Sequence, residues 1–120
     1  MLQSNRIRRA TLKARSTATR LVASCKRRPR SIATHLIAAG VDADTASGAA
    51  DGMRNAAKRI GLAPAKVART RRTVRGGRAR ITRTVYRWTR AQLARLIPAY
   101  KPRKPEYRAA LALLADALAA

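Results

Sequence analysis

The sequence has very few acidic residues, and this scarcity limits the partners that it can have. Its 120 residues include 5 Asp and Glu against 28 Lys and Arg, which gives a formal net charge of +23 at pH 7. So large a charge of one sign resists compaction unless a polyanion neutralises it. Nucleic acid is the first expected partner, because cationic side chains release counterions from phosphates. A membrane surface and an acidic protein are the alternatives.

Aromatic residues, cysteines and long apolar runs are scarce as well. Phe is absent and aromatics make up 3% of the chain, while much of the 47% hydrophobic fraction is Ala, which predicts a thin helical core. The single cysteine, Cys25, excludes an internal disulfide and is expected to be a small buried hydrophobe. No apolar run has the length of a bilayer span. We therefore expect a cytoplasmic, nucleoid-associated protein; a mitochondrial transit peptide at the Arg- and Ser-rich start is the alternative.

Residues of the types that act in catalysis or bind metal ions are few and scattered along the sequence. His35 is the only histidine, and no metal-ligand spacing, Gly-rich phosphate loop or nucleophile–base pattern occurs. We therefore expect a binding protein rather than an enzyme, with no catalytic residues, metal ligands or cofactors. His35 lies beside Leu36 and Ile37, which favours a packing or surface role.

The abundant basic residues are segregated along the chain. Residues 1–30 carry a net charge of +10 and residues 66–104 carry +14, and neither block contains an acid. Residues 31–65 are neutral overall, and residues 105–120 carry −1. This pattern predicts a basic N-terminal helix or arm over 1–30 and a domain over 31–100 with a basic hairpin at about 70–86. A linker and an amphipathic helix are expected over 101–120.

The first block predicts a helix from about Asn5 to Lys26. Apolar residues recur every three or four positions from Ile7 to Cys25, which draws one stripe along a helix, and Pro29 then ends it. The basic residues of this block are candidate nucleic-acid contacts: Arg6, Arg9, Lys13, Arg20, Lys26, Arg27, Arg28 and Arg30.

The neutral block predicts two helices joined by a short turn. Ser31 is a suitable cap for the first, and Gly40 suits the left-handed position that ends it. Asp42 or Asp44 caps the second helix, and Gly61 ends it.

The segment Ala38–Ala50, "AAGVDADTASGAA", resembles the turn and recognition-helix start of bacterial helix-turn-helix repressors. Gly40 stands in the place of the turn glycine and Val41 in that of the buried turn residue. The resemblance covers about 25 residues and implies that Thr45 and Ser47 face the DNA groove. The alternative is a helical hairpin that only supplies core, because phosphates repel the three aspartates of the second helix.

Residues 69–85, "RTRRTVRGGRARITRTV", contain seven arginines and no acid. A two-residue turn at Gly76-Gly77 pairs Arg72 with Ile81 and Arg71 with Thr82. Val and Ile then lie on one face and most arginines on the other, as a half-buried ribbon requires. A disordered basic tail is the alternative, since isolated ribbons are marginal in water. The candidate contacts in this block are Arg69, Arg71, Arg72, Arg75, Arg78, Arg80, Arg83 and Arg87.

The order of these elements is that of a winged helix. Pro64 fits the first turn of a short third helix over Ala63–Thr70, and the ribbon follows it. Tyr86 and Trp88 alternate with arginines and are candidates for stacking on bases, although for Trp88 we favour a core role. A capping box at Thr89 then begins another helix.

The C-terminal residues predict a closing helix with Pro105 in its first turn. Tyr107, Leu111, Leu114 and Leu118 recur at spacings of 4, 3 and 4 and form one apolar stripe. This stripe either packs back on the domain, which we favour, or pairs with its copy in a homodimer.

Together these features predict a mainly α fold of four or five helices with one basic two-stranded β-ribbon, winged-helix-like. The expected function is DNA binding by a bacterial or phage transcription regulator or architectural factor, with DNA favoured over RNA and no membrane partner. One alternative is an RNA-binding component of a ribosome or other ribonucleoprotein. Another is a basic interaction protein or inhibitor that docks on an acidic host protein.

Overall fold

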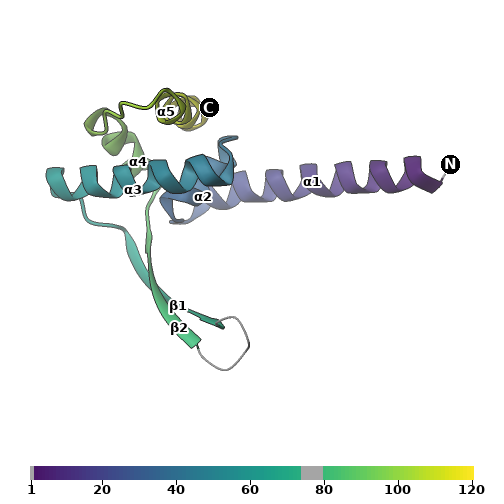
Figure 1. Cartoon of the computed structure of the whole chain (residues 1–120), viewed down its shortest axis with the longest axis horizontal. Helices are drawn as coiled ribbons and strands as arrows, with labels where there is room; N and C mark the ends of the chain where they lie inside the picture. Colours follow the sequence, from purple (N-terminus) through teal and green to yellow (C-terminus); the bar gives the residue numbers. More distant parts are fainter. Residues whose placement is uncertain (1, 74–79) are drawn as a thin grey trace.

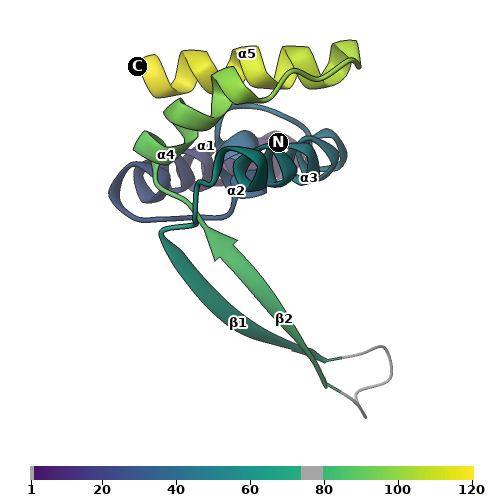
Figure 2. The same cartoon turned by 90° about the vertical axis from the view of Figure 1, so that its left-hand side faces the viewer.

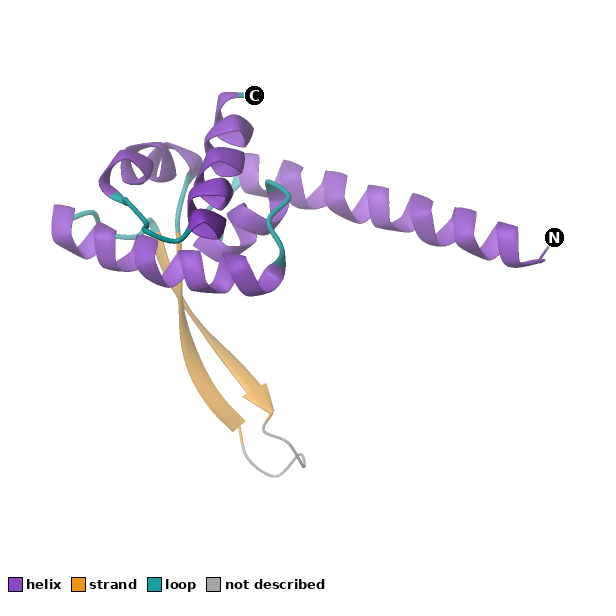
Figure 3. Ribbon diagram, turned by 45° about the horizontal axis from the view of Figure 1, so that its top comes forward, coloured by secondary structure: helices purple, strands orange, loops and turns teal. Residues whose placement is uncertain are grey.

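Helix α1 (Leu2–Arg27) is the longest element and extends well beyond the rest of the molecule (Figure 1). The computed structural model describes the backbone of residues 2–73 and 80–120 and the side chains of residues 4–70 and 82–120. The radius of gyration is 16.6 Å, whereas a compact chain of this length has about 13.6 Å. The excess reflects two arms, α1 and a β-ribbon, which leave a helical body in different directions (Figure 3).

Helices α2 (Ile32–Ala38) and α3 (Ala43–Ile60) begin at the predicted caps. The Thr34 N–H donates to Ser31 Oγ at 3.3 Å, and the Thr45 N–H donates to Asp42 Oδ2 at 3.0 Å, so Asp42 rather than Asp44 caps α3. Gly40 has a φ of 104°, which confirms its predicted left-handed conformation at the turn.

Strands β1 (Lys66–Thr73) and β2 (Arg80–Arg87) form an antiparallel ribbon, which confirms the predicted hairpin. Arg71 pairs with Thr82, Arg72 with Ile81 and Thr73 with Arg80, which is the register that a two-residue Gly76-Gly77 turn requires. The turn itself lies outside the described residues. The same is true of the rest of 74–79, including the predicted contacts Arg75 and Arg78.

The predicted third helix over Ala63–Thr70 is wrong. Strand β1 begins at Lys66, which pairs with Arg87, and the Ala65 N–H already donates to the Arg87 carbonyl at 2.9 Å. The hydrogen bonds of the long ribbon therefore replace those of a helix over this segment. Pro64 lies in the extended connection after α3 instead of opening a helix.

The chain then forms α4 (Arg90–Leu96), the short 3-10 turn η1 (Ile97–Ala99) and α5 (Pro105–Ala119). The predicted capping box is present: the Gln92 N–H donates to Thr89 Oγ1, and the Thr89 N–H donates to Gln92 Oε1. Helix α5 packs against α2, α3 and α4. It lies on the side of the body opposite to the ribbon (Figures 1 and 2).

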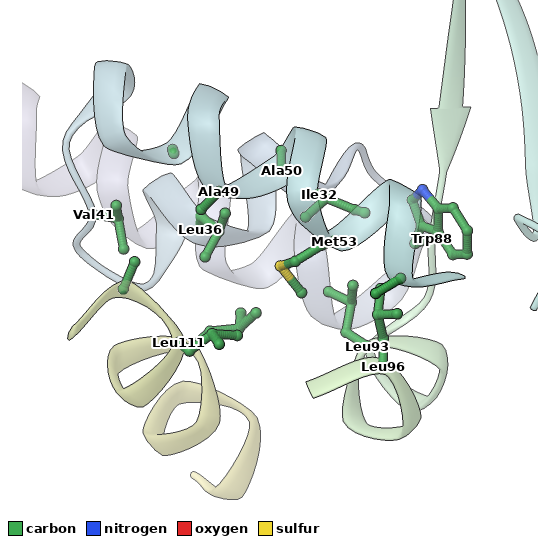
Figure 4. Close-up of a cluster of buried hydrophobic side chains, with 14 of the residues drawn as sticks. Ile32, Leu36, Val41, Ala49, Ala50, Met53, Trp88, Leu93, Leu96 and Leu111 are labelled. Carbon is green, nitrogen blue, oxygen red and sulfur yellow. The ribbon is translucent and has the colours of Figure 1, made fainter. Parts of the chain in front are cut away.

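The core is small and rich in Ala, as the composition predicts (Figure 4). Helix α3 lines it with alanines and with Met53, and Trp88 is only 3% exposed, which confirms its predicted core role. Leu111 and Leu114 of α5 are buried within the same molecule, while Leu113 is exposed. This confirms intramolecular packing of the stripe, and pairing of two copies through α5 stays a prediction.

Two glycines of α3 allow close contacts that a larger residue would obstruct. A Cβ at Gly48 would overlap with the Tyr107 hydroxyl, and one at Gly52 would lie 2.5 Å from the Tyr100 hydroxyl. Both glycines weaken an isolated helix by about 1 kcal/mol relative to Ala. Here they let the two tyrosines approach the α3 backbone.

The observed fold is thus mainly helical, with one two-stranded antiparallel ribbon, and it confirms the predicted fold class. Within the described residues, no helix is both long and apolar enough to cross a bilayer.

Candidate nucleic-acid interface

The outer part of α1 is a solvent-exposed basic arm. Residues 4–20 are all exposed, and the predicted apolar stripe packs only at its end, where Leu21 is half-buried and Cys25 buried. Ile7 is 65% exposed, so the first turns of the helix have no apolar partner in this chain. The hydroxyls of Thr11, Thr17 and Thr19 donate to helix carbonyls four residues earlier.

The cations of α1 form an uneven distribution around the helix. Arg6, Arg9, Lys13 and Arg20 recur at spacings of 3, 4 and 7 residues, which places them on one face. Arg8 and Arg15 lie on another face. At Lys26 and Arg27 the helix ends with two further exposed cations, which complement the negative end of the helix dipole. Exposed Arg28 continues the basic surface beyond the helix.

The ribbon is the second basic arm. Lys66, Arg69 and Arg83 are exposed and Arg87 is half-buried near the body. Arg71, Arg72 and Arg80 occupy the outer part of the ribbon according to the strand register. Eight residues per strand span about 27 Å, since a strand rises about 3.4 Å per residue.

Short contacts at Trp88 connect the two arms. The Arg30 N–H donates to the Trp88 carbonyl at 3.0 Å, and the Trp88 N–H donates to the Arg30 carbonyl at 2.7 Å. Arg30 lies three residues beyond α1, and its guanidinium is 3.4 Å from Ser24 Oγ on that helix. Arg30, predicted as a phosphate contact, is therefore half-buried at the junction of the arms.

His35 also bonds to Trp88 and so stabilises the junction of the two arms. Its Nε2 lies 2.8 Å from the Trp88 carbonyl, and the residue is 3% exposed. Burial lowers the pKa of His35 below its usual value; the bond to Trp88 opposes this effect, and Arg90 and Arg30 add to it. The neutral ring therefore donates its Nε2 proton to the carbonyl, in the packing role that the sequence predicts.

Cys25 lies beside the same junction as a buried thiol. Burial raises the pKa of the Cys25 thiol, and the nearby positive charges of Arg30 and Arg90 oppose the rise only in part. The thiol stays protonated at neutral pH, which fits the small buried hydrophobe expected from the sequence.

The start of α3 presents acids rather than cations. Asp42 and Asp44 are exposed, and the pKa of Asp42 is lowered by its hydrogen bonds from the Thr45 backbone and hydroxyl. The Thr45 hydroxyl, predicted to face the DNA groove, is thus held by Asp42 at 3.0 Å. Ser47 is exposed, as that prediction requires.

A groove of about 440 Å³ lies where the ribbon meets α2 and α3. Ser31 and Ser47 line it on the helical side, and Thr70, Arg83 and Tyr86 line it on the ribbon side. Arg54 of α3 also lines it and forms the one ion pair, with Asp51, in the described part of the chain.

Sequence reasoning missed Arg54 and the groove. Arg54 belongs to the neutral block, and Arg83 lies 29 positions further along the chain. Only the packing of the ribbon base beside α3 brings the two to one groove. A basic residue within a helix of mixed charge carries no signal of such a neighbour, so nothing in the sequence indicated it.

Comparison with models of known protein families, with curated proteins and with solved structures found no match to this chain.

Proposed function

We propose that this protein binds nucleic acid, with duplex DNA preferred to RNA, through phosphate contacts from α1 and the ribbon. The observation that carries the proposal is the pair of exposed basic arms that meet at Trp88. Arg54 is the only cation paired with a carboxylate among the described side chains. The exposed cations of α1 and of the ribbon have no carboxylate partner among the described side chains, which leaves them available to neutralise phosphates and release counterions.

The shapes of the two arms favour DNA. The major groove of B-DNA admits an α-helix or a two-stranded ribbon, whereas that of A-form RNA is too deep and narrow for side chains to read. Residues 4–20 of α1 form an exposed helix about 25 Å long, and the ribbon is of similar length. Each arm matches most of one turn of B-DNA, which is about 34 Å.

Phosphate binding rather than base reading accounts best for the charge distribution. Asp44 and Asp51 of α3, the expected recognition helix, and its cap Asp42 are exposed, and phosphates repel carboxylates. The Asp42 carboxylate also engages the Thr45 hydroxyl. The proposal is thus an architectural, sequence-tolerant DNA-binding protein of bacterial or phage origin, rather than an operator-reading regulator.

A salt series tests the proposal directly. Binding of the full chain to duplex DNA, single strands and structured RNA is measured by anisotropy at several salt concentrations. For duplex DNA the logarithm of the association constant should fall with the logarithm of salt concentration, with a slope of about −0.9 per phosphate contact. A slope near zero on every nucleic acid would contradict the proposal.

The other outcomes separate the alternative functions. Equal affinity for unrelated duplexes supports the architectural role, whereas a preference of about 10³-fold or more for one sequence indicates a regulator. Preference for structured RNA, together with co-sedimentation with ribosomes that nuclease treatment abolishes, indicates a ribonucleoprotein component. Retention of a single acidic protein after nuclease digestion indicates an interaction protein.

A further inference from the structure

The groove at the base of the ribbon differs in chemistry from the rest of the basic surface. Residues of β1 and β2 line it on one side and residues of α2 and α3 on the other, and its volume is about 440 Å³. Ligand sites for small organic groups have about 300–1,000 Å³. The groove is therefore large enough for one nucleotide and too small for a duplex.

Tyr86 supplies an exposed aromatic surface at this groove. It is 44% exposed, whereas Trp88, the residue that follows the end of β2, is buried in the core. The neighbouring hollow of about 390 Å³, which Lys58 and Asn55 of α3 help to line, also borders Tyr86. The ring therefore stands between two hollows, both lined by Arg54, instead of packing within the body.

Cationic and hydroxyl side chains line the same groove as Tyr86. Arg83 and Arg54 line the groove from opposite sides, and Ser47 is an exposed hydroxyl on α3. The Thr70 hydroxyl donates to the Arg83 carbonyl at 3.3 Å across the two strands. The carboxylate of Asp51 also lies near the groove, because it forms an ion pair with Arg54.

We propose that this groove holds one unstacked nucleotide of a single strand, its base on the Tyr86 ring and its phosphate beside Arg83 and Arg54. Every base has a flat π-face, so stacking on tyrosine requires no particular sequence. Arginine binds phosphate oxygens through paired N–H groups. The inference rests on the proposed function, because the arms bring the strand to the groove.

The test separates the base from the phosphate. The full chain is titrated with oligothymidylate and with an abasic oligonucleotide of equal length, which keeps the phosphates and lacks the bases. Stacking of one base predicts that the natural protein prefers oligothymidylate by at least about 5-fold. Tyr86→Ala and Tyr86→Leu should remove this preference, and Tyr86→Phe should retain it.

Val67 provides the matched control. It is the cross-strand partner of Tyr86 and is 54% exposed, so Val67→Ala removes an exposed side chain from the ribbon beside Tyr86 without removing a π-face. This variant should keep the preference for bases. Circular dichroism of each variant checks that the fold is retained.

The possible results are each decisive. Equal binding of the two oligonucleotides by the natural protein overturns the inference, as does an equal loss on both from Tyr86→Ala or an identical loss of preference in Val67→Ala. If salt-dependent duplex binding persists while the base preference is absent, only the nucleotide site fails. If no nucleic acid binds at all, the proposed function fails with it.

Discussion

The faces of the α1 arm should contribute unequally to DNA binding, and two matched double variants measure the difference. Arg9 and Lys13 belong to the face that also holds Arg6 and Arg20. At 3.6 residues per turn, Arg8 and Arg15 lie about 130° away from that face. All of these side chains are exposed. Because the first face concentrates more charge, it has the higher potential and should meet the phosphates.

The size of the effect follows from counterion release. Each phosphate contact contributes about 0.9 to the salt slope, so Arg9→Gln with Lys13→Gln should lower its magnitude by about 1.8. By the same relation, affinity at about 0.1 M salt should fall about 60-fold. Arg8→Gln with Arg15→Gln removes the same charge and should change the slope little. Gln has nearly the helix propensity of Arg and Lys, so the helix is retained.

The assay is an anisotropy titration of a labelled duplex over a salt series, with helicity checked by circular dichroism. If both double variants lower the slope equally, α1 acts as undirected charge and the assignment of a binding face is wrong. If neither variant changes the slope, α1 does not touch phosphate, and the ribbon carries the binding alone.

Three further predictions concern stability and charge. Burial lowers the pKa of His35 in the folded chain below its usual value of 6.5. At a pH between the folded and unfolded pKa values, His35 therefore binds more protons in the unfolded chain than in the folded chain. The free energy of unfolding should therefore fall as pH drops from about 7.5 to 5.5, by at most about 1.4 kcal/mol. Urea titrations should show this, and His35→Gln should flatten the dependence. Gly48→Ala should destabilise the fold by about 1–3 kcal/mol, because its Cβ meets the Tyr107 ring. In a Tyr107→Ala background the same change should stabilise α3 by up to about 1 kcal/mol, and thermal melts that show no such reversal would contradict the contact. Asp51→Asn should tighten duplex binding several-fold by releasing Arg54 from its ion pair, and unchanged affinity would place Arg54 away from phosphate.

Local signals in the sequence predicted most of the fold. The caps at Ser31 and Asp42 and the capping box at Thr89 involve contacts only three residues apart, so the sequence contains both partners. The ribbon register was also predictable, because a two-residue turn fixes which residues pair. These elements follow from chemistry within a short stretch of chain.

The errors and omissions concern distant contacts. Lys66–Thr70 carries no strong period, and only pairing with β2 makes it a strand rather than a helix. The glycines of α3 looked like weak points, since nothing in the sequence shows that Tyr100 and Tyr107 pack over them. The groove beside Tyr86 likewise depends on how the ribbon meets α3. These features can be recognised only once the tertiary structure is known.

The contacts of Trp88 argue that the two arms form one unit. Its N–H and carbonyl bond with Arg30, just beyond α1, and its carbonyl also accepts from buried His35. Turning the ribbon about its base would break these bonds and expose the buried indole, and each buried polar group left unpaired costs about 1–3 kcal/mol. The angle between α1 and the ribbon therefore belongs to the folded state. A duplex that touches both arms at once has to follow that angle, and sequences that bend readily should then bind more tightly without any contact to their bases.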